Sequence, residues 1–377
     1  MNNSLKLHKN LGGKIKIESK VSLKTRKYLS LAYTPGVAEA VNYIKDHHAS
    51  VYDLTIKRNT IAVVTDGSAV LGLGNVGAEA AIPVMEGKCA IFKEFADIDA
   101  FPICLKTQNV EKIVETVKNI SPVFGGINLE DVSAPRCFEI EEKLQKKLDI
   151  PVMHDDQHAT AIIVLAGLIN SAKILNKDLK KCKIVINGVG AAGTAITKLL
   201  YYFGANNLIL VDSKGIIGKN RSDLEDYKRE LFSFSNKYNL SGNLKKAVLK
   251  ADILIGVSVK RLFKKGIIQS MNPKPVVFAL ANPDPELTYL EAKKWGVAVY
   301  ANGRSDCRNQ INNALVFPGF FKGLLKRKIT KITDQMKLNA AEALTSLVKN
   351  PTANHFIPSI FDKRVVPTIE KSIISTK

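Results

Sequence analysis

One short segment, residues 183–212, constrains the fold more than any other part of the sequence. The apolar run KIVIN (183–187) leads directly into GVGAAG (188–193), and a second apolar run, NLILVD (207–212), follows one helix length later. A buried strand, a glycine-rich turn, a helix and another strand in this order predict a βαβ unit that binds a dinucleotide. The glycines let backbone amides approach a pyrophosphate at the positive end of the helix. The expected cofactor-binding residues are Gly188, Gly190, Ala191, Ala192 and Gly193.

The last residue of the second run, Asp212, indicates which dinucleotide binds. It follows Gly188 at about the distance at which dehydrogenases place the carboxylate that grips the adenosine ribose. Its charge should repel a 2′-phosphate, which favours NAD over NADP. Ser213 and Lys214 follow at once and could accommodate that phosphate, so NADP stays open. For the whole segment, the alternative is a tight strand-to-helix turn without a ligand.

Strand and helix patterns alternate from about residue 158 to residue 303. Three further apolar runs, ADILIGVS (251–258), PVVFALANP (275–283) and VAVYANG (297–303), are separated by polar stretches. Such alternation predicts an α/β fold with a Rossmann-type, doubly wound parallel sheet that helices cover on both faces. From about Arg304 the chain is predicted to be helical.

The first 157 residues predict a second, mixed α/β domain. TIAVVTDG (60–67) and CAIFKEF (89–95) are typical of strands, whereas VEKIVETVKNI (110–120) places its apolar residues at helical spacing. The domain ends in a polar loop, MHDDQHAT (153–160), and an apolar helix is expected from Ala159 to about Leu175.

A second G-x-G-x-x-G pattern, GLGNVG (72–77), follows the first of these strands. The separation between Gly77 and Gly87 is about ten residues, which is short for the helix of a full βαβ crossover. We therefore interpret GLGNVG as a turn that either faces an anionic group with its amides or is purely structural.

Net charge is the unusual bulk property: 55 Lys and Arg against 35 Asp and Glu give +20. A basic protein of this kind could bind nucleic acid. The lysines are scattered, however, and aromatic residues do not alternate with them as on a stacking platform. Attraction of an anionic substrate and cofactor accounts for the same charge, so we expect no nucleic-acid partner.

Cysteine spacing and hydropathy point to the cytoplasm. The five cysteines form no C-x-x-C pair, so buried reduced thiols are expected. The longest apolar runs, such as AIIVLAGLI (161–169), fall short of the roughly 20 residues that a bilayer span needs. The N-terminus also lacks the apolar region of a secretory signal. We expect a soluble cytoplasmic protein without a membrane partner.

Two pairs of adjacent carboxylates suggest a metal site. Glu130 and Asp131 stand just ahead of a predicted helix, and Asp155 and Asp156 stand in the polar loop. Adjacent carboxylates repel one another unless a cation is present, and three or four such oxygens with water suit Mg²⁺ or Mn²⁺. Capping of helix N-termini is the alternative. The neighbouring His154 and His158 are interpreted as loop and cap residues.

The residues alone give only weak candidates for acid and base. Lys88 precedes the apolar run CAIF, where burial would lower the pKa of an ammonium toward the range of a working base. Tyr33 precedes a Pro-Gly turn in LAYTPGVAEA and could equally be a structural aromatic.

Taken together, several motifs resemble the malic enzymes, specifically their short bacterial form. The resemblance covers nearly the whole chain in the correct order. The motifs are AYTPGVAEA, VVTDGSAVLGLGNVGAEAAIPVMEGKCAIFKEFADIDAFPI, GGINLEDVSAPRCFEIEEKL, PVMHDDQHATA, INGVGAAGTA, FALANPDPE and NQINNALVFPG.

This resemblance implies a role for each candidate residue. Tyr33 corresponds to the family's general acid and Lys88 to its general base. The metal carboxylates correspond to Glu130, Asp131 and Asp156, and the substrate and nicotinamide contacts to Asp155, Asn282, Asn312 and Asn313. One departure stands out: larger members carry an arginine for the substrate carboxylate where this chain has Ala69.

The implied reaction is oxidative decarboxylation of (S)-malate to pyruvate and CO₂ with NAD, or NADP, and Mg²⁺ or Mn²⁺. The resemblance also implies a homodimer in which the tyrosine can come from the partner subunit. The expected organisation is a substrate and metal domain (1–157), a dinucleotide-binding domain (158–303) and a helical segment that completes the cleft (304–377). Two alternatives remain, namely malolactic conversion to lactate and a non-catalytic dinucleotide- or RNA-binding protein.

Overall fold

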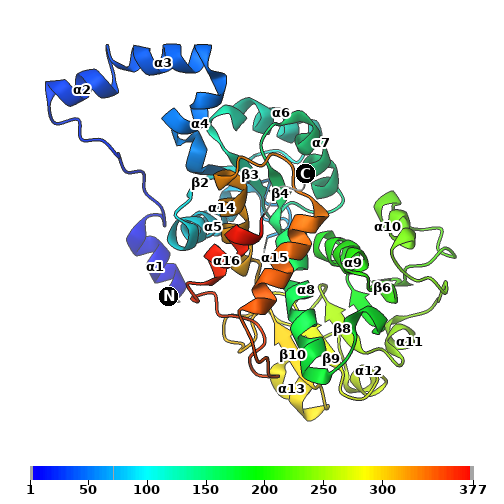
Figure 1. The fold of residues 1–377 in the computed structure, drawn as a ribbon. Coiled ribbons are helices and arrows are strands. Elements are labelled where there is room, and N and C mark those ends of the chain that lie inside the picture. Colours follow the sequence, from blue (N-terminus) through cyan, green and yellow to red (C-terminus); the bar gives the residue numbers. More distant parts are fainter. Residues whose placement is uncertain (1–2, 71, 374–377) are drawn as a thin grey trace.

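The computed structural model describes residues 3–70 and 72–373. The ends of the predicted terminal domains, residues 1–2 and 374–377, lie outside the described residues, as does Leu71. Within the described ranges the chain forms two mostly parallel sheets, each with helices around it (Figure 1).

The first sheet lies in the N-terminal part and has the strand order β2-β1-β3-β4, all parallel. Alternate residues of β1 face opposite sides: Ile61 and Val63 pack against α5, whereas Ala62 and Val64 pack against α6 and α7. Helices on both faces explain why the strand is a continuous buried apolar run. The elements are β1 (Thr60–Thr65), β2 (Asp99–Cys104), β3 (Gly126–Leu129), β4 (Val152–His154), α5 (Ala78–Ala96), α6 (Val110–Ile120) and α7 (Arg136–Lys147).

The prediction of a strand at Cys89–Phe95 is wrong, because this segment is part of the single long helix α5. Buried residues of α5 recur at helical spacing and form one stripe against the sheet: Ala81, Met85, Cys89, Phe92 and Ala96. The run CAIF alone could not reveal this period, because a short apolar run fits a strand and a buried helix equally well. The crossover from β1 is therefore a full helix, and Gly87 lies inside it rather than at its end.

The second sheet has the order β10-β9-β8-β5-β6-β7, and only the short edge strand β7 is antiparallel. The predicted doubly wound Rossmann-type fold is confirmed. One face packs on α8 and α9, and the other on α11 to α13. The elements are β5 (Ile184–Asn187), β6 (Leu208–Asp212), β7 (Gly215–Ile216), β8 (Ile253–Gly256), β9 (Val276–Ala279), β10 (Val299–Asn302), α9 (Ala191–Phe203), α10 (Asp226–Glu230), α11 (Leu244–Val248), α12 (Lys265–Gln269) and α13 (Tyr289–Lys294).

One long helix, α8 (Asp155–Leu175), connects the two sheets. It begins four residues earlier than predicted, so Asp155 and Asp156 lie in its first turn and not in a loop. The domain boundary expected at 157/158 falls inside this helix. By length and composition α8 could cross a membrane, but most of it is buried against neighbouring helices, which is typical of a core helix.

The C-terminal part is helical, as predicted. The helices α14 (Phe317–Lys326), α15 (Asp334–Ser346) and α16 (Val365–Ser372) pack against one another and against α5 and α8. Their apolar residues join a single hydrophobic core that includes residues of both sheets. The two halves of the molecule therefore share one core.

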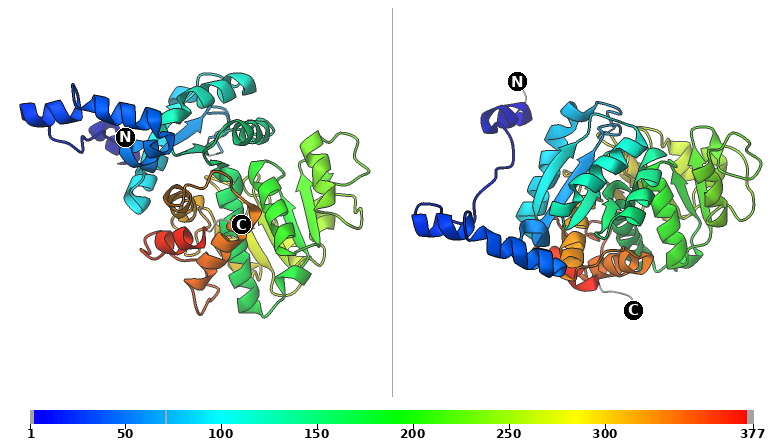
Figure 2. Two further views of the ribbon diagram at one scale, coloured as in Figure 1. Left: turned by 45° about the horizontal axis from the view of Figure 1, so that its top comes forward. Right: turned by 90° about the horizontal axis from the view of Figure 1, so that it is seen from above.

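Residues 26–46 form an arm that extends away from the rest of the chain (Figures 1 and 2). The arm contains α2 (Arg26–Ala32) and α3 (Val37–Asp46), neither of which buries a residue. It exposes large apolar side chains: Tyr28, Leu29, Leu31, Tyr33, Val37, Val41 and Tyr43. Ahead of it lies α1 (Asn3–Leu11), and α4 (Val51–Leu54) follows it.

Candidate active site

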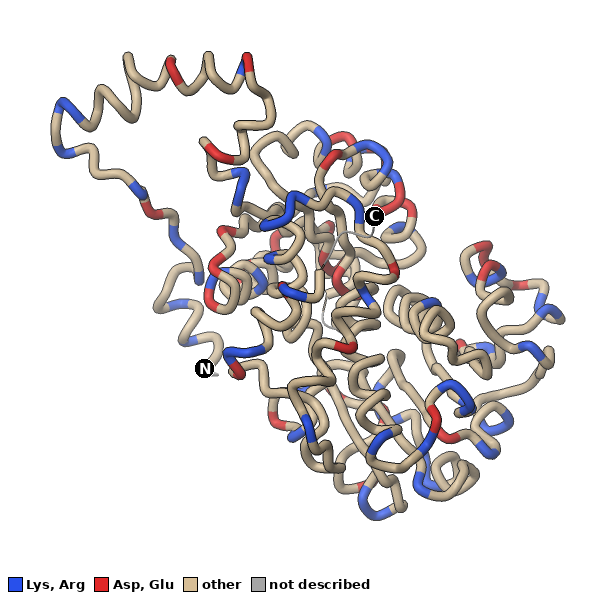
Figure 3. The backbone as a smooth tube through the Cα atoms, viewed as in Figure 1, with Lys and Arg blue, Asp and Glu red and all other residues tan. Residues whose placement is uncertain are grey.

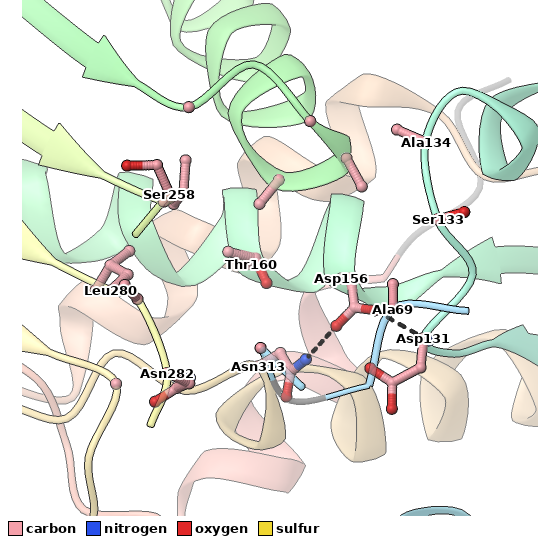
Figure 4. A pocket seen from close by; sticks show the side chains of 18 of the residues that line it. Ala69, Asp131, Ser133, Ala134, Asp156, Thr160, Ser258, Leu280, Asn282 and Asn313 are labelled. Atoms are coloured by element: carbon pink, nitrogen blue, oxygen red, sulfur yellow. Dashed lines mark hydrogen bonds between the residues drawn. The ribbon is translucent and has the colours of Figure 1, made fainter. Parts of the chain in front are cut away.

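A cavity of about 1510 Å³ lies between the two sheets. Its lining comes from the loops that follow the carboxyl ends of strands in both sheets: Ala69 follows β1, Glu130 follows β3, Gly188 follows β5, Val257 follows β8 and Leu280 follows β9. In open α/β folds this edge of the sheet is where ligands bind. Figure 4 shows side chains from both halves of the molecule facing this space.

The glycine-rich turn after β5 forms one wall of the cavity. A Cβ atom on Gly188 would lie 2.5 Å from the Val257 carbonyl oxygen, and one on Gly193 would lie 1.9 Å from the Gly188 oxygen, so both positions require glycine. A Cβ on Gly190 would meet nothing within 4 Å, so that position opens onto the cavity at the N-terminus of α9. Ala191 and Ala192 line the same wall. Backbone amides at a helix N-terminus beside open space fit a pyrophosphate.

The other glycine motif is held by close packing. A Cβ on Gly72 would lie 2.1 Å from the carbonyl oxygen of Asn282, so the turn fits directly against the loop after β9. Gly77 precedes the first residue of α5 and has a positive φ of 82°. The alternative that GLGNVG is a structural turn therefore explains Gly72 and Gly77. Gly72 and the Asn282 that it contacts both line the cavity.

Asp212 ends β6 at the far end of this wall. Both of its carboxylate oxygens accept hydrogen bonds from Arg221, and its Oδ1 also accepts from the Lys214 backbone amide. Burial alone would raise the pKa of this carboxyl, but the bonds from Arg221 and Lys214 outweigh it and lower the pKa. Lys228 lies 3.6 Å away. Asp212 is therefore charged, and two cationic side chains, Arg221 and Lys228, lie beside it.

Three carboxylates meet where the two halves of the molecule join. Oxygens of Glu130, Asp155 and Asp156 all lie within 4.8 Å of one another. The first turn of α8 supplies two of them, where the helix dipole favours negative charge. Burial, together with the negative charge of Asp155, raises the pKa of both Glu130 and Asp156. So much buried negative charge requires a positive partner.

The cluster fits a divalent cation. Among the described residues, Oδ1 of the fully buried Asp155 has no hydrogen-bond partner. Asp131 adjoins the cluster: its backbone amide donates to Asp156 Oδ2 at 3.1 Å, and Figure 4 shows its carboxylate beside the cavity. Hard oxygen donors of this kind suit Mg²⁺ or Mn²⁺. Glu130, Asp131 and Asp156 could hold such an ion, and Asp155, rather than Asp131, completes the group of three carboxylates whose oxygens lie within 4.8 Å of one another.

Lys88 is brought to this cluster from the middle of α5. Its Nζ lies 2.6 Å from Asp155 Oδ2 and 3.0 Å from Glu130 Oε2, and the residue is only 9 % exposed. Burial acts to lower the pKa of Lys88, but the charges of these carboxylates outweigh it and raise the pKa above its ordinary value. Burial thus acts in the expected direction, but the expected lowering of the pKa is wrong as a net effect, because three carboxylates that the sequence pattern did not place there lie beside Lys88.

The loop before α14 supplies the asparagines. Asn313 Oδ1 accepts a hydrogen bond from Lys88 Nζ at 3.3 Å, and its Nδ2 lies 3.5 Å from Asp156 Oδ1 (Figure 4). Asn312 also lines the cavity, although its side chain accepts from the Ala314 amide. Asn282 comes from the loop after β9 and also lines the cavity (Figure 4). All three predicted asparagines thus lie around one space.

Tyr33 is the predicted residue that the chain does not bring to its own cavity. It ends α2 on the arm and is 66 % exposed. The two histidines lie outside the cavity lining: His154 is fully buried, and His158 contacts Glu141 at 3.0 Å. Neither is a loop residue: His154 ends β4 and is the N-cap residue of α8, although its side chain makes no capping hydrogen bond, and His158 lies within α8. Within the described residues the five cysteines are free, as predicted.

Sequence reasoning missed two contributions to this site. Arg221 contacts Asp212 from a loop whose sequence has no regular pattern. The only sequence feature that points to this contact is the position of the arginine, nine residues after the expected ribose carboxylate. Glu141 accepts from the His154 amide and the Gln157 side chain and thereby braces the start of α8. Its signal was weaker still, because a glutamate within EIEEKL is expected on a solvated face.

Nearly the whole chain is similar in sequence to known proteins. Residues 12–145 match the malic enzyme N-terminal domain, and residues 158–370 match the malic enzyme NAD-binding domain. The bifunctional malic/malolactic enzyme of Bacillus subtilis is 50 % identical over 373 residues, covering 98 % of this chain and 91 % of that protein. The NAD-dependent malic enzyme of Geobacillus stearothermophilus is 50 % identical over 97 % of this chain and 76 % of its own.

A solved structure agrees with the sequence comparison. The crystal structure of the NAD-dependent malic enzyme of Thermotoga maritima superposes with a TM-score of 0.95 at 45 % identity and covers 99 % of both chains. Coverage of 99 % includes the segments that form both sheets. On the evidence of its two domain matches, its relatives and its fold, this chain belongs to the malic enzyme family.

Proposed function

We propose that the protein catalyses the oxidative decarboxylation of (S)-malate to pyruvate and CO₂ with reduction of NAD or NADP, in the presence of Mg²⁺ or Mn²⁺. The observation that carries this proposal is the position of Lys88, which contacts Asp155 and Glu130 inside the cavity that the dinucleotide turn lines. A proton-accepting group, a cation site and a hydride-acceptor site thus share one space. Membership of the malic enzyme family supports the same reaction.

Lys88 is proposed as the general base. Lys88 Nζ would accept the proton of the C2 hydroxyl of malate, and a dinucleotide held by the glycine-rich turn would supply the acceptor for the C2 hydride, so that oxaloacetate forms. A divalent cation held by Glu130, Asp131 and Asp156 would supply Lewis-acid polarisation of the C2 oxygen and would offset part of the negative charge that raises the pKa of Lys88. Asp155 and Asn313 hold the Lys88 side chain in place through their contacts with Nζ.

The second half of the reaction needs an acid. The C3–C4 bond breaks, CO₂ leaves, and its electron pair forms enolpyruvate, which then takes a proton at C3. Tyr33 is proposed as the donor, delivered by the arm of a second subunit. The arm supports a homodimer, because its exposed apolar side chains need a covering surface. Asn282 and Asn312 are proposed as ligands on the substrate and nicotinamide side of the cavity.

NAD is the proposed preferred cofactor. The charged Asp212 can accept hydrogen bonds from the adenosine ribose and opposes a 2′-phosphate. Arg221, Lys214 and Lys228 lie near this end of the cavity and could bind a 2′-phosphate, so NADP is the second candidate cofactor. The three segments 1–157, 158–303 and 304–377 are proposed to act as the substrate, dinucleotide and cleft-closing parts of one unit.

The protein is proposed to act on a small molecule as a soluble cytoplasmic enzyme, without nucleic acid or membrane. In support, Lys and Arg are spread over the whole chain rather than gathered in one stripe (Figure 3). A stripe on one face would be expected of a nucleic-acid-binding protein.

One relative favours a second candidate reaction. The Bacillus subtilis protein is described as a bifunctional malic/malolactic enzyme. Malolactic conversion would use the same Lys88 base but return the hydride to pyruvate before release, so that lactate appears without net reduced cofactor. Chromatography of the products from malate separates the two reactions.

The direct test supplies purified protein with (S)-malate, Mn²⁺ and either NAD or NADP, and follows the ultraviolet absorbance of the reduced nicotinamide. We expect a malate-dependent rise, faster with NAD, and pyruvate as the product. No rise with either cofactor and no lactate would refute the proposal.

A further inference from the structure

We propose that Lys14 binds a carboxylate of the substrate and takes the place of the positive charge that is absent at Ala69. This inference rests on the proposed malate chemistry and adds a residue to it. The ammonium group of Lys14 lines the cavity from the segment that follows α1, although it is remote in sequence from every other cavity residue except His8.

The cavity offers few cations for a dicarboxylate. Its lining includes four lysines and no arginine: Lys14, Lys88, Lys214 and Lys228. Lys214 pairs with Asp223, and Lys228 pairs with Glu225 and lies near Asp212, so both belong to the ribose end of the cavity. Lys88 pairs with Glu130 and Asp155.

Lys14 differs from these lysines in its partner. Its Nζ donates to the backbone carbonyl of Pro83, and within the described residues no carboxylate pairs with it. The residue is half-buried, its bond to Pro83 is exposed, and an ammonium whose partner is a neutral carbonyl retains most of its capacity to bind an anion. Of the four lysines that line the cavity, Lys14 is thus the one for which the described residues supply no carboxylate partner.

The backbone around Lys14 is fixed rather than loose. Its amide donates to Glu86 Oε2 at 3.3 Å, so the segment is attached to α5 through both backbone and side chain. Gly13 has a φ of +137°, and a Cβ there would lie 3.3 Å from Glu86 Oε1. A glycine therefore permits the close approach that positions Lys14.

The face of α5 beneath Lys14 leads directly to the proposed base. Val84, Gly87, Lys88 and Ile91 occupy one side of the helix at helical spacing and all line the cavity. A Cβ on Gly87 would meet only Lys14 Nζ, at 3.8 Å. The absence of a side chain at Gly87 lets Lys14 Nζ approach the turn of α5 that carries Lys88, so both lysines line the one cavity that a small dicarboxylate could occupy.

Chemistry indicates which carboxylate Lys14 binds. The C4 carboxylate loses its negative charge as CO₂ departs, so a cation bound to it would stabilise the ground state more than the transition state. The C1 carboxylate keeps its charge through to pyruvate. Lys14 is therefore assigned to C1, where its contribution persists through the reaction.

The test compares Lys14→Met and Lys14→Arg with the wild type in steady-state malate oxidation. Loss of a charged hydrogen bond should raise KM for malate in Lys14→Met by about 10- to 100-fold, with a much smaller change in kcat. KM for NAD should stay unchanged. Inhibition by pyruvate, which retains the C1 carboxylate, should weaken by a similar factor. Lys14→Arg should keep KM for malate near that of the wild type.

Lys16→Met is the matched control, because Lys16 is exposed and pairs with Glu18 outside the cavity. It should behave as the wild type. Three results would overturn the inference: unchanged KM for malate in Lys14→Met, an equal rise in KM for malate and for NAD, or failure of Lys14→Arg to restore binding. A wild-type protein without malate activity would instead refute the proposed function, so the two failures can be told apart.

Discussion

Arg221 donates hydrogen bonds to both carboxylate oxygens of Asp212, at 2.6 and 3.2 Å, and to both oxygens of Asp223. The guanidinium therefore neutralises the residue expected to reject a 2′-phosphate. Cofactor choice depends on this pair, not on Asp212 alone, because removal of Asp212 frees the Arg221 Nη1 group, which Asp223 does not bind, to contact a phosphate.

The first prediction concerns this pair. Asp212→Ala should raise the ratio of kcat/KM with NADP to kcat/KM with NAD by about 10- to 100-fold, because repulsion disappears and the Arg221 Nη1 group becomes free. Initial rates with both cofactors measure the ratio. In the double variant Asp212→Ala/Arg221→Ala the gain should fall to the part that comes from lost repulsion alone. If the double variant keeps the full gain, Lys214 or Lys228 binds the phosphate instead.

Lys88→Ala should lower kcat by about 10²- to 10⁴-fold, the usual contribution of a positioned general base. Cofactor binding should persist, because the dinucleotide turn lies on another wall of the cavity. Nicotinamide fluorescence titration measures the binding, and malate turnover measures the loss. Turnover near that of the wild type would mean that another group removes the proton.

Mn²⁺ should stabilise the wild type against thermal unfolding, because an ion that binds only the folded carboxylate cluster shifts the unfolding equilibrium. At a Mn²⁺ concentration of about 100 times Kd the gain is roughly 2.7 kcal/mol. Glu130→Gln and Asp156→Asn should lose most of this gain and the activity with it. Glu139→Gln is the control, since Glu139 pairs with Lys143 on the surface. Equal gains in all variants would place the ion elsewhere.

Subunit mixing tests whether Tyr33 acts across a dimer. Tyr33→Phe and Lys88→Ala homodimers should each be nearly inactive. After denaturation and joint refolding, half of the dimers are mixed and each carries one intact site, so activity should return to about a quarter of the wild-type level. Mixtures that stay inactive would show that Tyr33 and Lys88 do not serve one site from two chains.

The contacts of Asp252 predict how the free energy of unfolding changes with pH. It accepts from Lys177 Nζ at 2.7 Å and from the Lys183 amide at 3.0 Å. Burial opposes the charge, but these bonds outweigh it and lower the pKa of Asp252. A lowered pKa means that the stabilisation is present above the ordinary pKa of about 3.9 and is lost as pH falls through the folded value.

Asp252→Asn should therefore destabilise the protein by about 1 to 3 kcal/mol at pH 7, and the difference should shrink below about pH 4. Denaturant unfolding across this pH range measures it. Asp53→Asn, which removes an exposed pair with Lys328, should change little at any pH. A difference that stays constant at low pH would contradict the charge-based explanation.

The sequence predicted the dinucleotide unit because every signal for it is local. The strand at 184–187, the turn at Gly188 and the strand at 208–212 succeed one another within a single supersecondary unit, and the structure reproduces them. The helix at 110–120 was predicted for the same reason, since its apolar spacing is regular over several turns.

The errors lie where local pattern is ambiguous or absent. Cys89–Phe95 belongs to a helix whose stripe is visible only over the full span from Ala78, and the first turn of α8 is polar because the site needs carboxylates there. Lys14 contacts Pro83 across 69 positions of sequence, a relationship that no spacing rule reports. The site was thus predictable as a set of residues through the family resemblance, but its electrostatics were not.

The continuous helix α8 has one more consequence. Its first turn carries Asp155 and Asp156, and its length packs along α9, whose own first turn forms the dinucleotide cradle. Because the two helices pack against each other along their length, their first turns can move little relative to each other. Helix geometry and this packing therefore set the distance between the carboxylate cluster and the glycine-rich turn before any ligand binds. Such preorganisation spares the protein part of the entropy cost of aligning hydride donor and acceptor.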